Sequence, residues 1–353
     1  MPIKDAAGID KNFKVPNRVL RDDLVYYNAK ELDVYGLTHE GGIYRRMPYE
    51  IAKTVSDNVA QISCECAGGR VRFVTNSPYI AIFVKYRSVS KVPNYSNTAT
   101  LGFDLYSAKR YIGCFVPAID TLEAFESIIN LEDVKDTARK KEYTLNFPVC
   151  SEIEELYIGV QEGSIMEKAP KYAIEKPIVF YGSSVTQGAC ASRPGNTYAN
   201  IISRTLNCDY VNLGFWGNAL GEPEMASYIA GLNMSAFVLD YDYNAPTVEH
   251  LAKTHEKMFQ IIRERNPNLP IIILSRPKYY LNEEEKQAFE VIKCTYENAL
   301  ARGDKHVSLI AGRDMLKSVK DTALADNIHP GDSGFINMAK YIGGAIKQFL
   351  NKK

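Results

Sequence analysis

The sequence contains no C-x-x-C pair, no long run of apolar residues and no surplus of either charge. Without a C-x-x-C pair, neither a zinc ribbon nor a thioredoxin-like redox site is expected. Without an apolar run of about 18 residues, no helix is expected to span a membrane. The 42 lysine and arginine residues balance 42 aspartate and glutamate residues. Binding to nucleic acid or to a membrane surface usually requires a basic surplus, so this balance argues against both.

The seven cysteines are odd in number and scattered, and only Cys64 and Cys66 lie close together. We therefore expect free, mostly buried thiols, as in a reducing compartment. The first residues, Met1 to Asp5, lack the apolar core of a signal peptide. We expect a cytoplasmic protein, or a secreted or periplasmic one if a signal sequence has been removed.

A length of 353 residues corresponds to about two domains. The first half is rich in short segments in which apolar and polar residues alternate, which is typical of strands. Many short strands at close spacing predict a β-sandwich or jelly roll, which we place at residues 1–166. The segments are 71–75, 80–86, 102–106, 111–116, 141–145 and 156–160.

The second half, residues 167–353, has a different period. Short apolar runs alternate with amphipathic helical patterns, of which the clearest lies between Val248 and Ile262. This alternation predicts a parallel sheet with helices on both faces. The polar stretch 167–171 marks the expected boundary between the halves. The apolar runs are 177–181, 210–214, 236–240 and 270–274.

Polar residues and glycines follow the predicted parallel strands. Ser184 comes after the first strand, Gly217 after the second and Asn244 after the third, while Asp326 and His329 precede the last helix. Open α/β sheets bind their ligands at the carboxyl ends of the strands. We therefore expect these five residues to gather in one site.

Their chemical types suit acyl transfer. A serine hydroxyl becomes a nucleophile when a base takes its proton, so His329 is the candidate base for Ser184. Asp326, three residues before His329, is the candidate acid that orients the imidazole. The N–H groups of Ser184 and Gly217 and the side-chain amide of Asn244 are candidate donors of an oxyanion hole.

These residues resemble the sequence blocks of the SGNH (GDSL-type) hydrolase superfamily. Gly182-Ser183-Ser184 is similar to the first block, Gly214 and Gly217 to the second, Asn244 to the third, and Asp326-x-x-His329 to the last. The sequence departs from the common pattern at Ser183, where many members have aspartate. It also departs in the third block, which reads Asp242-Tyr243-Asn244-Ala245 rather than G-x-N-D. The resemblance covers about residues 177–350. It implies a flavodoxin-type parallel sheet, the Ser184, His329 and Asp326 triad, and neither a cofactor nor a metal.

The stretch Gly102-Phe103-Asp104-Leu105-Tyr106 resembles the G-x-D-L-Y signature of a bacterial subfamily with an N-terminal β-domain. Residues 181–188 and 193–195 resemble the same subfamily, whose relatives include carbohydrate esterases. This resemblance implies a serine esterase that acts on O-acyl esters of a carbohydrate, with O-acetyl as the expected group. The expected partner is a small-molecule or oligosaccharide ester, and the sequence gives no indication of the oligomeric state.

Four alternatives compete with this interpretation. One is a lipase or thioesterase for longer acyl chains, and another is a carbohydrate-binding protein that has lost its chemistry. A nucleotide site at residues 182–188 is disfavoured, because the stretch lacks the Gly-Lys-[Ser/Thr] ending of a P-loop. A metal site made of Asp240, Asp242 and His329 is likewise disfavoured.

Three further residues are candidates for substrate contact. Arg193, Trp216 and Arg276 follow strand ends or lie inside the blocks, although each could instead pack or form a salt bridge. Cys190 is interpreted as a small packing residue. Because pockets often form between domains, we also expect an aromatic or polar residue from before position 165 to reach toward Ser184.

Overall fold

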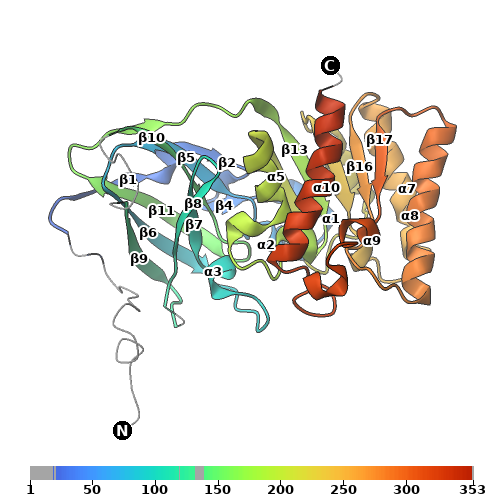
Figure 1. The fold of residues 1–353 in the computed structure, drawn as a ribbon, viewed down its shortest axis with the longest axis horizontal. Coiled ribbons are helices and arrows are strands. Elements are labelled where there is room, and N and C mark those ends of the chain that lie inside the picture. Colours follow the sequence, from blue (N-terminus) through green and yellow to red (C-terminus); the bar gives the residue numbers. More distant parts are fainter. Residues whose placement is uncertain (1–18, 20, 119, 132–138, 352–353) are drawn as a thin grey trace, which may run out of the picture.

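The computed structural model describes residues 19, 21–118, 120–131 and 139–351. An antiparallel β-sandwich lies beside a parallel sheet with helices on both faces (Figure 1). The predicted fold class is therefore confirmed. All seven cysteines are free and four of them are buried, as expected.

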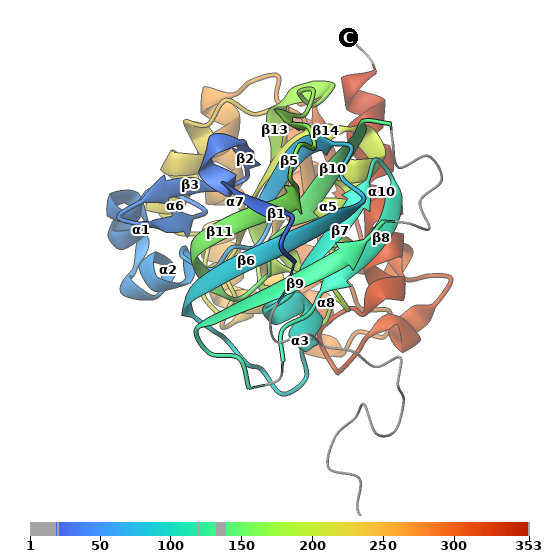
Figure 2. The same cartoon turned by 90° about the vertical axis from the view of Figure 1, so that its left-hand side faces the viewer.

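The sandwich consists of two antiparallel sheets. Its core contains alternate residues of the strands, such as Ile80, Ile82 and Val84, which pack with Val71 and Phe73 of the other sheet. One sheet, in front in Figure 2, has the order β1(Leu24–Asn28), β11(Glu152–Gln161), β6(Tyr79–Ser88) and β9(Ala124–Asn130). The other has the order β12(Met166–Lys168), β5(Arg70–Thr75), β10(Lys141–Asn146), β7(Phe103–Ser107) and β8(Arg110–Phe115), and β2(Asp33–Tyr35) also pairs with β5. Shorter elements of this part are η2(Ala29–Glu31), β3(Thr38–Glu40), β4(Ile43–Arg45) and α3(Asn97–Thr100).

The parallel sheet has the strand order of flavodoxin. The first strand along the chain lies between the second and the third, and the fourth and fifth extend the sheet on one side. Ligands bind where the order reverses, at the carboxyl ends of the first and third strands. The order is β14(Cys208–Gly214), β13(Ile174–Gly182), β15(Ala236–Asp240), β16(Ile271–Leu274) and β17(Val307–Ile310).

Both faces of this sheet are buried, which explains why its strands are continuous apolar runs. On β13, Val179 and Tyr181 face one hydrophobic cluster, whereas Ile178 and Phe180 face another. The first cluster includes α6(Pro223–Ala230), α7(Val248–Arg265) and α8(Glu283–Ala301), and the second includes α5(Tyr198–Leu206), α9(Gly312–Met315) and α10(Asp332–Leu350). Short helices in the connections are α4(Ser184–Gln187), η3(Pro194–Asn196), η4(Asp242–Asn244) and η5(Lys320–Ala323). No helix in the described part of the chain is both long and apolar enough to cross a membrane.

Two helices of the first half, α1(Tyr49–Val55) and α2(Asp57–Ile62), were not expected from its strand pattern. They pack on the α/β layer, where Ala52, Val59 and Ile62 share a core with residues such as Leu213. The helices are too short to show a clear amphipathic period. The predicted boundary falls at the start of β12, which still pairs with β5, so the division into two domains stays a prediction.

Buried arginines join the two halves. The guanidinium of Arg46 donates to the carbonyl oxygens of Ile62, at 2.7 Å, and of Gly214. Arg70, which is only 1% exposed, stacks on the ring of Tyr210 and pairs with Asp209. A buried charge requires partners, so these contacts fix how the sandwich sits against the parallel sheet.

Replacing Ile62 with alanine should destabilise the parallel layer, although Ile62 belongs to the first half of the sequence. Truncating a buried isoleucine leaves a cavity, and we expect a loss of about 2–5 kcal/mol in the free energy of unfolding. Urea denaturation followed by the fluorescence of Trp216, the only tryptophan, measures this loss. An unchanged fluorescence midpoint with a shifted circular-dichroism midpoint would contradict the shared core.

Candidate active site

The carboxyl ends of three neighbouring strands bring the predicted site residues together. Gly182, at the end of β13, pairs with Gly214 on one side and with Asp240 on the other. Ser184 is the first residue of α4, directly after β13. Gly217 and Asn244 follow β14 and β15 in the same way. The site therefore lies at the point where the strand order reverses.

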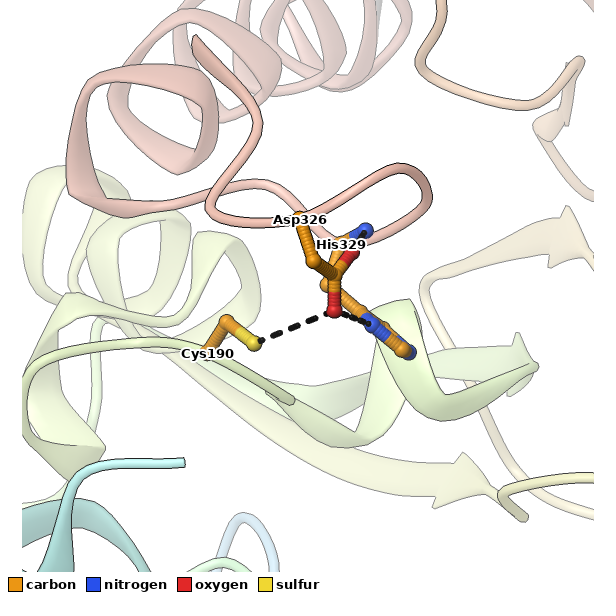
Figure 3. Close-up of side chains that lie close together, drawn as sticks. All are labelled: Cys190, Asp326 and His329. Carbon is orange, nitrogen blue, oxygen red and sulfur yellow. Dashed lines mark hydrogen bonds and ion pairs between the residues drawn. The ribbon is translucent and has the colours of Figure 1, made fainter. Parts of the chain in front are cut away.

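Ser184, His329 and Asp326 form a continuous chain of hydrogen bonds. The Oγ of Ser184 lies 2.8 Å from Nε2 of His329, and Nδ1 of His329 lies 2.8 Å from Oδ2 of Asp326. Asp326 and His329 belong to one loop, which precedes α10 (Figure 3). An imidazole between a hydroxyl and a carboxylate is arranged to accept the hydroxyl proton.

The carboxylate of Asp326 is held in place by its own loop. Its Oδ1 accepts the N–H groups of Ile328 and His329, each at 2.7 Å. Partial burial raises the pKa of Asp326, but these N–H groups and the His329 side chain outweigh it and lower the pKa to about 2. Asp326 is therefore ionised at neutral pH and can accept a proton-bearing Nδ1 of His329.

Three donors lie at the strand ends around Ser184. The N–H groups of Ser184 and Gly217 have no acceptor within the described residues. Gly217 has a φ of +67°, a backbone conformation that favours glycine, and its position faces open space. The side-chain amide of Asn244 donates to the carbonyl of Phe215 at 2.8 Å, which fixes its orientation and leaves its second hydrogen available.

Two family comparisons cover most of the sequence. Residues 175–347 match the GDSL-like lipase/acylhydrolase family, and residues 24–166 match the GxDLY family, the N-terminus of SGNH-hydrolase-type esterases. The chain belongs to the GDSL-type, or SGNH, hydrolases. It is an esterase of the branch that carries the GxDLY N-terminus.

Solved structures of similar proteins share this architecture. A protein described as a GDSL-like lipase from Bacteroides ovatus has 28% identity and a TM-score of 0.83, over 93% of this chain and 98% of that one. Salicylyl-acyltransferase SsfX3, from a tetracycline biosynthetic pathway, has 20% identity and a TM-score of 0.71, over 93% and 95%. The acetyl xylan esterase Est2A of Butyrivibrio proteoclasticus has 15% identity and a TM-score of 0.59, over 93% and 99%. The last two show the fold alone. No curated protein sequence matches the chain.

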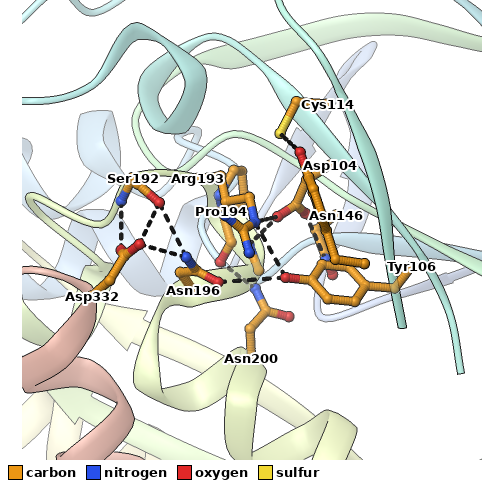
Figure 4. Close-up of polar contacts among 12 residues, drawn as sticks. Asp104, Tyr106, Cys114, Asn146, Ser192, Arg193, Pro194, Asn196, Asn200 and Asp332 are labelled. Atoms are coloured by element: carbon orange, nitrogen blue, oxygen red, sulfur yellow. Dashed lines mark hydrogen bonds and ion pairs between the residues drawn. The ribbon is translucent and has the colours of Figure 1, made fainter. Parts of the chain in front are cut away.

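The GxDLY stretch of this esterase binds the loop that follows the nucleophile helix (Figure 4). Asp104 is fully buried and accepts the N–H of Gly195 at 2.8 Å and the amide of Asn146 at 2.8 Å. A Cβ at Gly195 would lie 2.4 Å from the ring of Tyr106. Only glycine therefore allows the strand and the loop to approach this closely.

Two of the three residues predicted to contact substrate, Arg193 and Arg276, form salt bridges within the protein. The guanidinium of Arg193 lies 3.5 Å from Asp104 and 3.3 Å from the hydroxyl of Tyr106. Arg276 binds the buried Asp242 through its backbone N–H at 3.1 Å and its side-chain Nε at 3.2 Å. These salt bridges match the structural alternative for both arginines, and their contact with substrate stays a prediction.

Trp216, the third candidate, is 47% exposed at the end of β14. Its indole N–H donates to the carboxyl of Glu65, at 3.1 Å, and its backbone N–H donates to Gln187. Burial raises the pKa of Glu65 to about 7, although the hydrogen bonds from Gln187 and Trp216 act in the opposite direction. A residue of the first half thus fixes an exposed aromatic ring close to the nucleophile helix.

Asn94 and Tyr95 are site residues that the sequence did not identify. The side-chain amide of Asn94 donates to Oδ2 of Asp326 at 2.6 Å, on the same oxygen that faces His329. The ring of Tyr95 contacts the imidazole of His329 edge-on, with centroids 5.7 Å apart. Residues before position 165 therefore contact Asp326 and His329, and their predicted part in a pocket at Ser184 stays a prediction. Nothing in the local sequence distinguishes this Asn-Tyr pair from an ordinary turn.

Asn94→Ala should lower kcat by about 10-fold and leave KM nearly unchanged. A hydrogen bond to a charged group is worth about 1.5–3 kcal/mol, and this one positions the triad rather than the substrate. Steady-state kinetics on p-nitrophenyl acetate measures the effect. Asn268→Ala, at an exposed position between α7 and β16, serves as the matched control. A rise in KM with constant kcat would show instead that Asn94 binds substrate.

Proposed function

We propose that this esterase hydrolyses short O-acyl esters, O-acetyl esters above all, of a carbohydrate. The single observation that carries the proposal is the hydrogen-bonded chain from Ser184 through His329 to Asp326. No step of the reaction requires a cofactor. The membership in the GDSL-type hydrolases supports ester hydrolysis, and it argues against a carbohydrate-binding protein without chemistry.

In the proposed reaction, Nε2 of His329 takes the proton of Ser184 while Oγ attacks the ester carbonyl carbon. The negative charge that develops on the carbonyl oxygen is stabilised by the N–H groups of Ser184 and Gly217 and by the amide of Asn244. His329 then gives its proton to the oxygen of the leaving alcohol, and an acyl-enzyme remains. Water repeats the sequence, releases the acid and restores Ser184.

A carbohydrate alcohol is favoured by the exposed ring of Trp216. An indole combines a flat apolar face with one polar group, and the faces of sugar rings are apolar in the same way. Here the polar group is already used by Glu65, so the face of the ring is available for stacking. A lipase or thioesterase for long acyl chains remains the alternative, and it requires an apolar channel leading to Ser184.

Acyl preference and alcohol preference require separate measurements. Hydrolysis of p-nitrophenyl esters from acetate to longer chains should be fastest for acetate. Acetate release should be faster from acetylated sugars than from ethyl acetate. If the rate instead increases with chain length, the esterase is a lipase or thioesterase.

Ser184→Ala should abolish ester hydrolysis and leave the fold intact. Loss of a triad member typically lowers the rate by several orders of magnitude, and the only hydrogen bond of the hydroxyl among the described residues is that with His329. The measurement is the rate on p-nitrophenyl acetate, with circular dichroism as the test of folding. Near wild-type activity in a pure preparation would remove Ser184 as the nucleophile.

Asn244→Ala should lower kcat by about 100-fold, because one oxyanion donor is worth about 3 kcal/mol. Asn244 lies on the short η4 helix, and the only hydrogen bond of its side chain in the described residues is that to the carbonyl of Phe215, so the variant should fold. Comparison of kcat with KM is the measurement. A variant in which kcat holds and KM rises would place Asn244 in substrate binding.

A further inference from the structure

A thiol lies beside the triad. Cys190 follows the nucleophile helix and has a φ of +64°, a left-handed conformation that residues other than glycine rarely adopt. Its Sγ donates to the backbone carbonyl of Asn94 at 3.4 Å and lies 3.9 Å from Oδ2 of Asp326 (Figure 3). The thiol is only partly buried. The constrained backbone therefore holds an accessible sulfur against the acid of the triad.

Three potential metal ligands of different types meet at this point. One ligand atom from each of Cys190, Asp326 and His329 lies within 4.8 Å of the other two. Zn²⁺ binds sulfur at about 2.3 Å and nitrogen or oxygen at about 2.0–2.2 Å, so its tetrahedral ligands lie about 3–4 Å apart. The distance from Sγ to Oδ2 is 3.9 Å, and that from Oδ2 to Nδ1 is 2.8 Å. Only small movements would bring the three atoms around one ion.

We propose that Cys190, Asp326 and His329 form an inhibitory site for Zn²⁺. In the described residues, no other group of three cysteine, histidine or acidic side chains has this spacing. A thiolate, an imidazole and a carboxylate suit Zn²⁺, whereas Mg²⁺ and Ca²⁺ require oxygen ligands. Three protein ligands leave the fourth position of the ion for water.

Neighbouring hydrogen bonds hold the carboxylate of Asp326, one of the three proposed ligands, in place. Oδ1 of Asp326 accepts two backbone N–H groups, which leaves Oδ2 as the ligand oxygen and fixes its direction. Asn94 donates to the same Oδ2 and holds the carboxylate from the opposite half of the chain. Such outer contacts orient metal ligands and increase affinity.

Inhibition follows from the tautomer of His329, and this step depends on the proposed function. In the active form Nδ1 carries a proton toward Asp326, and Nε2 has the lone pair that accepts the proton of Ser184. When Zn²⁺ binds the lone pair of Nδ1, the ring proton moves to Nε2. The thiol of Cys190 loses its proton to solvent, so one proton is released for each ion bound. His329 then presents an N–H to Ser184 and cannot act as its base.

The kinetic experiment compares each preparation with its own rate in the presence of a chelator. Wild-type protein and the control Cys294→Ser, on the exposed face of α8, should lose activity as Zn²⁺ is added, but not with Mg²⁺. Cys190→Ser should require at least about 10-fold more Zn²⁺ for the same fractional loss, because one ligand is removed. Equal inhibition of Cys190→Ser and wild type would overturn the proposal, as would a wild type that Zn²⁺ does not inhibit.

A second experiment is independent of esterase activity. Co²⁺ replaces Zn²⁺ in such sites, and a bound thiolate gives a charge-transfer absorption band. Ser184→Ala should show this band at one equivalent of Co²⁺, and Ser184→Ala with Cys190→Ser should not. If the wild-type protein has no esterase activity but the band still depends on Cys190, the proposed function is wrong and the metal site is supported. A band that persists without Cys190, or no band at all, would overturn the site.

Discussion

The burial of one carboxyl group, that of Asp104, holds the loop after α4 against the sandwich, in addition to the contacts of Arg46 and Arg70 that join the two halves. A buried carboxyl group is costly unless it is hydrogen-bonded, and Asp104 finds its partners on both sides of the junction. Asn146 binds it within the sandwich, whereas the N–H of Gly195 and the guanidinium of Arg193 belong to the loop after the nucleophile helix. Ser192 belongs to the same loop and directly precedes Arg193. Its backbone N–H and its hydroxyl donate to Asp332 at the start of α10. Asp104 is thereby linked through this loop to Asp332 at the start of α10 (Figure 4), and α10 directly follows the loop of His329.

The sandwich also contacts the candidate site directly. Asn94 and Tyr95 contact the acid and the base of the triad, and Glu65 holds Trp216. Arg46 binds the carbonyl of Gly214, at the end of the strand that leads to the oxyanion glycine. The first half thus contacts the candidate site at three places, although the proposed nucleophile, base and acid all come from the second half.

The sequence predicted the parts of the site that depend on local order along the chain. Ser184, Gly217 and Asn244 could be placed because each follows a buried strand, and parallel strands share one carboxyl edge. The pair Asp326 and His329 could be placed because three residues on one loop bring them into contact. Asn94 could not be predicted, since its contact with Asp326 joins positions 232 residues apart and leaves no pattern in the neighbouring sequence.

The elements of the fold also include some that the sequence predicted and some that it did not. The run 177–181 predicted β13 because burial on both faces makes every residue apolar. The helices α1 and α2 escaped prediction because each spans only two turns or fewer. They are held by packing on the α/β layer, through residues such as Val59, rather than by a long amphipathic period. The sequence also left two roles open for Arg193 and Arg276. A guanidinium that follows a strand end can bind a substrate or can form a salt bridge with a buried aspartate.

Four carboxyl groups near the site show how the environment assigns their roles. Burial raises the pKa of Glu65 to about 7, of Asp240 to about 7 and of Asp104 to about 6. Asp326 alone among these four has a lowered pKa, because backbone N–H groups and His329 donate to it. Asp240, at the end of β15, accepts from the hydroxyls of Thr186 and Tyr198 and has no cation beside it. A fixed negative charge there, next to the oxyanion donors, would oppose the charge that develops on the substrate. Because burial raises the pKa of Asp240 to about 7, Asp240 carries less negative charge at neutral pH than Asp326, which in the proposed reaction stabilises the protonated His329.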